Sequence, residues 1–304
     1  MKTGVKYALT VCGMVVSWSV FYAVSKLVVG ATGSPLLGGL LLRAAALVFL
    51  TAQLLADGSF RRLFSQRGRT LAVLLLIGMF GFLLDLFANL GYLHGSLSTG
   101  TALLKTDVLM VNLATVIVYK KKLYASDWLG SAIMLAGVLL VLGVDFGGME
   151  LRVTDLFFLL SAACVSANAF IIKAAQEKYG ADSDMISYYN NLTVLALFAA
   201  CSAATGSFRA EAFGAIARFW PLVALGGLAQ TGIYFFYYRC LRHCEVWLVK
   251  LYLLLMPVLS CFIGVVFLNE ELTAKKLLGV GVVLLGAAII LLRGRINRAA
   301  GGAK

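Results

Sequence analysis

The chain has 304 residues, of which 61% are hydrophobic and only 13% charged, with a net charge of +12. A soluble globular domain carries about 25% charged residues, so the composition excludes a water-soluble protein and predicts a lipid bilayer as its surroundings. The positive charge does not indicate nucleic-acid binding here, because Lys and Arg accumulate in the cytoplasmic loops of membrane proteins. We therefore expect the bilayer, and no nucleic acid, as a partner.

Ten apolar segments follow one another along the chain, each close to the roughly 20 residues that cross a bilayer as a helix. They cover residues 7–29, 35–55, 71–93, 97–119, 127–144, 155–175, 185–204, 219–240, 246–268 and 274–292. The first is longer than the apolar core of a signal peptide, and no A-x-A cleavage site follows it, so we expect it to be retained. The pattern predicts an all-α membrane protein with ten transmembrane helices.

The loops predict the orientation of these helices. Most Lys and Arg residues fall in alternate loops that share one side, such as residues 61–69 and 120–122. The positive-inside rule places that side in the cytoplasm. We therefore expect a multi-pass protein of the inner (plasma) membrane with both termini cytoplasmic.

The two halves of the chain resemble each other. A shift of 149 residues lays the segment 122–142 on 271–291 and matches Gly130 with Gly279 and Gly137 with Gly286. We predict a first repeat at 1–149 and a second at 150–304. Because each would hold five helices, an odd number, the second would enter the membrane inverted, as in many secondary transporters. The four glycines are expected at helix contacts, where small residues let backbones approach.

Several motifs carry a family resemblance. The second half has Pro257, a Glu271-Leu272 corner and the glycine-spaced last helix, and the first half has Trp18, Lys26 and Arg43. This pattern resembles the EamA-like family of the drug/metabolite transporter superfamily, although Val108 and Lys122 stand where the second half has Pro257 and Glu271. The resemblance implies a secondary carrier of small polar or amphipathic molecules, often an exporter.

Ionisable residues inside the predicted spans are candidates for function, because each costs at least ~2.5 kcal/mol at the bilayer centre. At ~1.5 Å per residue, four of them lie about 12 to 15 Å below the outer ends of their helices; these are Arg43, Asp85, Lys105 and Asp107. Two interpretations stay open, a neutral structural cluster of ion pairs and the floor of a polar cavity. Lys105 and Asp107 would point to opposite faces of a continuous helix. Asp85 is expected within reach of Arg43 or Lys105, and it is the proton-coupling candidate.

The remaining candidates are mostly neutral. Lys250 lies about 6 Å from the cytoplasmic end of its helix, where it would either snorkel or supply a surplus cation to the cavity. Gln230 and Tyr234 are spaced i, i+4 on one helix face, as are Trp18 and Tyr22. We expect most of the aromatic run 234–238 to face lipid or packing. The candidate substrate-binding residues are Trp18, Tyr22, Arg43, Asp85, Asn89, Lys105, Asn168, Gln230, Tyr234 and Lys250.

No nucleotide-binding, metalloprotease, serine-hydrolase or EF-hand motif is present. Cys240, His243 and Cys244 lack a fourth ligand and are interpreted as packing residues rather than a metal site. We therefore expect a small-molecule transporter without cofactor, metal or enzymatic activity, working by alternating access on a substrate or proton gradient. Two alternatives remain: an exchanger of anionic metabolites anchored by Arg43, Lys105 and Lys250, and a non-transporting membrane assembly subunit. Homodimer formation is a further alternative for the oligomeric state.

Overall fold

The structure, a computed structural model, describes residues 2–60, 63, 68–94, 103–117, 120, 125–141, 153–207, 210–268 and 273–301. These residues form helices and turns and contain no strand. The helices are α1 (Lys2–Thr32), α2 (Pro35–Ala56), α3 (Arg69–His94), α5 (Asp107–Ile117), α6 (Ala125–Val141), α7 (Val153–Lys178), α8 (Ser183–Ala204), α9 (Ala210–His243), α10 (Val246–Tyr252), the 3-10 turn η2 (Leu253–Leu255), α11 (Met256–Leu268) and α12 (Ala274–Gly301). The all-helical class predicted from the sequence is confirmed for this part of the chain.

Helix lengths support a membrane protein but not a count of spans. Within the described residues, five helices are long and apolar enough to cross a bilayer, namely α1, α2, α3, α7 and α9. Shorter apolar helices occupy Ala125–Leu140, Val246–Ser260 and Leu277–Gly286. The ten-span count therefore stays a prediction.

Two of the predicted spans are not continuous helices. In the fourth, 97–119, residues 97–102 lie outside the described part, and a turn at Lys105 and Thr106 precedes α5. The Thr106 hydroxyl donates to the carbonyl of Leu103 at 2.7 Å, a side-chain bond that competes with helix continuation. The ninth, 246–268, is interrupted by η2 between α10 and α11. The inference that Lys105 and Asp107 point to opposite faces assumed an unbroken helix, and the turn between them removes that basis.

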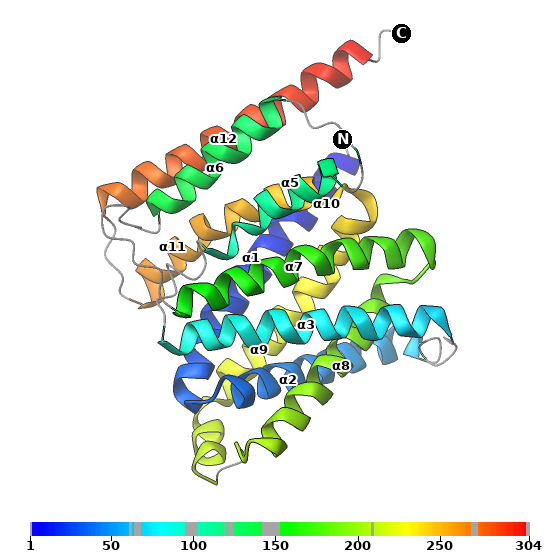
Figure 1. Cartoon of the computed structure of the whole chain (residues 1–304), viewed down its shortest axis with the longest axis vertical. Coiled ribbons are helices and arrows are strands. Elements are labelled where there is room, and N and C mark those ends of the chain that lie inside the picture. The colour runs from blue at the N-terminus through cyan, green and yellow to red at the C-terminus, as the bar shows by residue number, and fades with distance from the viewer. Residues whose placement is uncertain are drawn as a thin grey trace.

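The helices pack in corresponding pairs from the two halves (Figure 1). α1 packs on α9 as α7 packs on α3, and α2 packs on α9 as α8 packs on α3. α2 and α8 contact each other, whereas α6 and α12 pair along one side of the bundle. Sequential helices of one half are therefore held mainly by helices of the other, which places the interface between the halves at the centre of the molecule.

The α6–α12 pair is built on the glycines that the repeat singled out. A Cβ added to Gly137 would lie 2.6 Å from the backbone nitrogen of Val283, and one added to Gly286 would lie 2.8 Å from that of Met134. Along α6 Met134 comes before Gly137, whereas along α12 their partners come in the reverse order, with Gly286 after Val283. The two helices are therefore antiparallel. The prediction that Gly137 and Gly286 face another helix is confirmed, and only glycine permits so close an approach.

Candidate functional site

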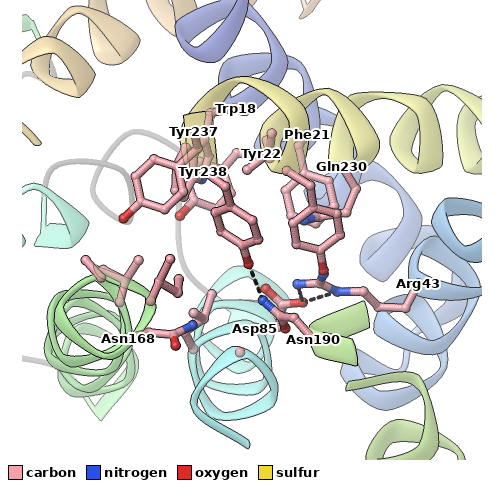
Figure 2. A pocket seen from close by; sticks show the side chains of 17 residues that line it. Trp18, Phe21, Tyr22, Arg43, Asp85, Asn168, Asn190, Gln230, Tyr237 and Tyr238 are labelled. Atoms are coloured by element: carbon pink, nitrogen blue, oxygen red, sulfur yellow. Dashed lines mark hydrogen bonds and ion pairs between the residues drawn. The ribbon is translucent and has the colours of Figure 1, made fainter. Parts of the chain in front are cut away.

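A pocket lies inside the bundle between α1, α2 and α3 of the first half and α7, α8 and α9 of the second (Figure 2). Its wall combines aromatic rings, three amides and one ion pair, all buried. The side chains that give it this character are Trp18, Phe21, Tyr22, Arg43, Asp85, Asn168, Asn190, Gln230, Tyr234, Tyr237 and Tyr238. Three helices from each half thus contribute to one central chamber.

The charged part of the wall is the pair Arg43–Asp85. Nε and Nη2 of Arg43 donate to Oδ2 of Asp85 at 2.7 and 2.5 Å, and both side chains are almost fully buried. Arg43 also donates through Nη1 to the hydroxyl of Tyr234, which in turn donates to Oδ1 of Asn191 at 3.4 Å. Asn191 closes the network by donating from Nδ2 to the carbonyl of Arg43 at 2.9 Å. Asp85 therefore lies within reach of Arg43, one of the two partners that its depth predicted.

The neutral part of the wall carries polar atoms without a partner. Nδ2 of Asn190 donates to the Tyr238 hydroxyl at 2.5 Å, but Oδ1 of Asn190 has no hydrogen-bond partner among the described residues. The same is true of Oδ1 of Asn168 within that part of the chain. Buried polar atoms are normally satisfied, so these two acceptors stand out in the pocket wall.

The aromatic part of the wall comes from α1 and α9. Trp18 and Tyr237 meet edge to face with ring centroids 4.8 Å apart. Tyr234, Tyr237 and Tyr238 are all buried and line the pocket, which corrects the expectation that most of the run 234–238 faces lipid or packing. Tyr237 and Tyr238, like Phe21, were not among the candidates, although their i, i+3 and i, i+4 spacing from Tyr234 and Trp18 places them on the same helix faces.

Asn89, Lys105 and Lys250 do not line this pocket. Asn89 accepts a hydrogen bond from Ser25 at Oδ1, 2.9 Å away, and donates from Nδ2 to the carbonyl of Pro35 at 3.3 Å. Asn89 thus holds α3 against α1 and against the start of α2, which is a structural role. Lys105 is buried, with 4% of its surface exposed, in the turn before α5.

Lys250 neither snorkels nor supplies a surplus cation. Its side chain is completely buried, and Nζ lies 3.0 Å from Oδ2 of Asp107 on α5. The ammonium also lies 5.8 Å from the ring centroid of Trp18 and 5.5 Å from that of Tyr237. Both sequence-based interpretations of Lys250 are wrong, because counting along a helix gives the height of a residue but not the charge that faces it from another helix.

Metal binding has no support in the part of the chain that the structure describes, where no group of three His, Cys, Asp or Glu side chains is suitably placed. Cys240 is buried in α9, and Cys244 is half-buried just beyond its end.

Comparisons with known proteins agree with this architecture. The model of the EamA-like transporter family matches the chain twice, at residues 5–143 and 152–292. An uncharacterized transporter in the cobO 3' region of Sinorhizobium sp is 31% identical over 134 residues, covering 43% of this chain and 92% of that protein. A protein crystal structure matches with a TM-score of 0.69 at 20% identity, over 93% of this chain and 98% of the other, and so shares the fold. The two matches to the family model span nearly the whole sequence, and the chain belongs to the EamA-like transporter family.

Proposed function

We propose that this protein is a secondary transporter of small polar or amphipathic metabolites and that the central pocket is its substrate site. The observation that carries the proposal is the pocket's position between three helices of each half, together with the unpartnered polar atoms in its wall. In transporters built from repeats, the substrate binds near the midplane where the repeats meet. Rocking of one half against the other would then open the same chamber to each side in turn.

The pocket wall favours a particular kind of substrate. Oδ1 of Asn168 and Oδ1 of Asn190 are acceptors, so they favour a molecule that donates hydrogen bonds through amine, amide or hydroxyl groups. Trp18 and Tyr237 offer ring surface to an apolar or flat portion of that molecule. The charges of Arg43 and Asp85 compensate each other, so the wall itself selects neither cations nor anions.

An anionic-metabolite exchanger is the second candidate. Three buried cations, Arg43, Lys105 and Lys250, share the interior with the carboxylates Asp85 and Asp107. A further carboxylate, Asp127, is buried in α6. Because Arg43 pairs with Asp85 and Lys250 with Asp107, any preference for anions would rest on Lys105 rather than on Lys250. The pocket does not include Lys105, and for this reason the donor-rich substrate is preferred. Family membership favours either transporter over a non-transporting assembly subunit.

We also propose that the protein lies in the inner membrane with both termini in the cytoplasm, on the basis of the loop charges. Reporter fusions after Lys304 and within residues 145–154 should report opposite sides. The same side for both would exclude an odd number of spans between these two points, and with it five spans in the second repeat.

The substrate proposal is tested with purified protein in proteoliposomes. A thermal-shift screen with matched neutral, zwitterionic, cationic and anionic amphipathic compounds supplies hits, whose flux is then measured. Asn168→Leu keeps the volume of the side chain but removes the acceptor, and should weaken binding of donor compounds by about 1–3 kcal/mol, or roughly 5- to 150-fold. Leu156→Ala, exposed on the same helix, is the control and should leave flux unchanged. No flux above that of protein-free liposomes, or unaltered binding by Asn168→Leu, would contradict the proposal.

A further inference from the structure

A second buried ion pair, separate from the pocket, joins the two halves of the molecule. Asp107 belongs to the first half and Lys250 to the second, and their charged atoms are 3.0 Å apart with side-chain exposures of 4% and 0%. By contrast, Arg43 and Asp85 both belong to the first half. Any motion of one half against the other must therefore act on the Asp107–Lys250 contact, as it must on the hydrogen bond from Arg43 to Tyr234 of the second half.

This pair sits where the helices are interrupted. Asp107 is the first residue of α5, directly after the turn at Lys105 and Thr106, and Lys250 lies in α10 just before η2. The starts of α5 and α11 are Asp107 and Met256, which are 149 residues apart and so correspond in the two repeats. Discontinuous helices form ion and substrate sites in secondary transporters. A turn precedes α5 in the first repeat, whereas η2 in the second tightens the helix to a 3-10 turn without leaving helical backbone angles.

The surroundings of Asp107 leave one of its oxygens open. Oδ2 faces Lys250, while Oδ1 has no hydrogen-bond partner among the described residues. The titratable groups near Asp107 are Lys250 from α10, Lys105 from the preceding turn, Tyr237 from α9 and Tyr22 from α1. From α7, Ser166 donates to the backbone carbonyl of Asp107 at 3.2 Å and leaves the carboxylate untouched.

Asp85 is held differently. Its Oδ2 receives two N–H groups of a single guanidinium, which is a charge-assisted arrangement. Asp107 instead lies near two ammonium groups, those of Lys250 and Lys105. In the same position the Lys250 ammonium also lies over the rings of Trp18 and Tyr237, which attract a cation. Lys250 can thus stay charged when Asp107 is neutral, and the two rings that would then hold it also line the pocket.

From these contacts we propose that Asp107 is the proton-binding carboxylate of the transport cycle and that its pair with Lys250 latches the two repeats in one access state. The proposal rests on the alternating-access function proposed above. A proton from the aqueous side adds to the carboxylate and gives a neutral acid, while Lys250 remains an ammonium and loses its counter-ion. The latch weakens, and the halves are free to rock around the pocket.

The test uses the proton alone, so it does not depend on finding a substrate. One pair of spin labels is introduced at Ala31 and Thr205, and a second pair at Asp57 and Tyr179. Each site is exposed and lies at or beside a helix end, and each pair has one label in the first half and one in the second. The full chain, with its six cysteines replaced and His94 and His243 changed to Gln, is placed in nanodiscs. Distance distributions are measured by electron-electron resonance at pH 5.5 and pH 8.5.

Between these pH values the ratio of the two access states should change by about tenfold or more in this background, a shift large enough to resolve. Asp107→Asn should show the low-pH distribution at both pH values, whereas Asp85→Asn should retain the shift. Asp107→Glu should restore it. If Asp107→Asn does not fold, Lys250→Met answers the same question, because it also removes the latch.

Two results would overturn the proposal: no pH-dependent shift in the parent background, or a full shift in Asp107→Asn or Lys250→Met. Neither result bears on flux, so failure here is distinguishable from failure of the transporter proposal. If substrate flux is observed but the latch proposal is overturned, the transporter function is kept and only the role of Asp107 as the coupling group is rejected.

Discussion

The two halves of the chain form the same helix contacts from corresponding residues. On α3, Gly78 lies against Thr193 of α8, and on α9, Gly227 lies against Ala45 of α2. The glycines are 149 residues apart and their partners 148, so each contact is the repeat of the other. Lipid tails are as apolar as the helices, so such contacts depend on close packing, which requires small residues in both halves.

The polar residues break this correspondence. Asp85 on α3 corresponds to Tyr234 on α9, and Arg43 on α2 corresponds to Asn191 on α8. The first half therefore holds a buried ion pair where the second holds a neutral hydrogen bond of 3.4 Å. Packing explains what the halves share but does not require this difference, so the asymmetric residues are the better guide to function.

The largest expected effect comes from removing half of the charged pair. Asp85→Leu leaves Arg43 buried without its carboxylate and should lower the free energy of unfolding by about 3–5 kcal/mol, measured by equilibrium denaturation in mixed micelles. In the second half, Tyr234→Phe should lose only about 1.5–3 kcal/mol, because Arg43 keeps Asp85 as its counter-ion.

The double variant Arg43→Met with Asp85→Leu separates charge from shape. Replacing both partners of a buried ion pair is often neutral, so it should recover most of the loss. Equal losses for Asp85→Leu and Tyr234→Phe, or a double variant as unstable as Asp85→Leu, would mean that the charge asymmetry does not set the stability of this region.

A smaller effect is expected where the halves are alike. Gly137→Leu and Gly286→Leu place a side chain against the backbone of the partner helix, and each should lower the free energy of unfolding by about 1–3 kcal/mol. Gly281→Leu on α12 is the matched control, since an added Cβ there meets nothing within 4 Å. The two substitutions should lower the free energy of unfolding by similar amounts. A clear difference between the two losses would show that the α6–α12 pair is less symmetric in energy than in its contacts.

Much of this fold was predictable because it follows local patterns. Apolar stretches predicted the helices, and the glycine spacing predicted that Gly137 and Gly286 face other helices. The common depth of Asp85, Arg43 and Lys105 predicted that Asp85 lies within reach of one of the two cations, which is Arg43. These patterns succeed because helix length, height in the membrane and the face of one helix can all be counted along the sequence.

What failed depends on how helices from different halves meet. The turn at Lys105 contains neither Pro nor Gly, so no local signal marks it. The partner of Lys250 comes from α5, in the other half, and a residue's height does not reveal which helix faces it. Tyr237 and Tyr238 are different, since their spacing from Tyr234 on α9 would have placed them on the pocket face.

The smallest effect on stability should come from the pocket itself. Oδ1 of Asn168 has no partner among the described residues, so Asn168→Leu removes no hydrogen bond made by that atom. Burying an unsatisfied amide is unfavourable, and an apolar side chain of similar volume should be neutral or slightly stabilising, within about 0.5 kcal/mol. The free energy of unfolding of Asn168→Leu is measured by equilibrium denaturation without added compounds and is compared with that of Asp85→Leu. A loss as large as that of Asp85→Leu would show that Asn168 supports the fold like the ion pair. A stable variant with weakened substrate binding would instead separate the residues that hold the two halves together from those left open for the transported molecule.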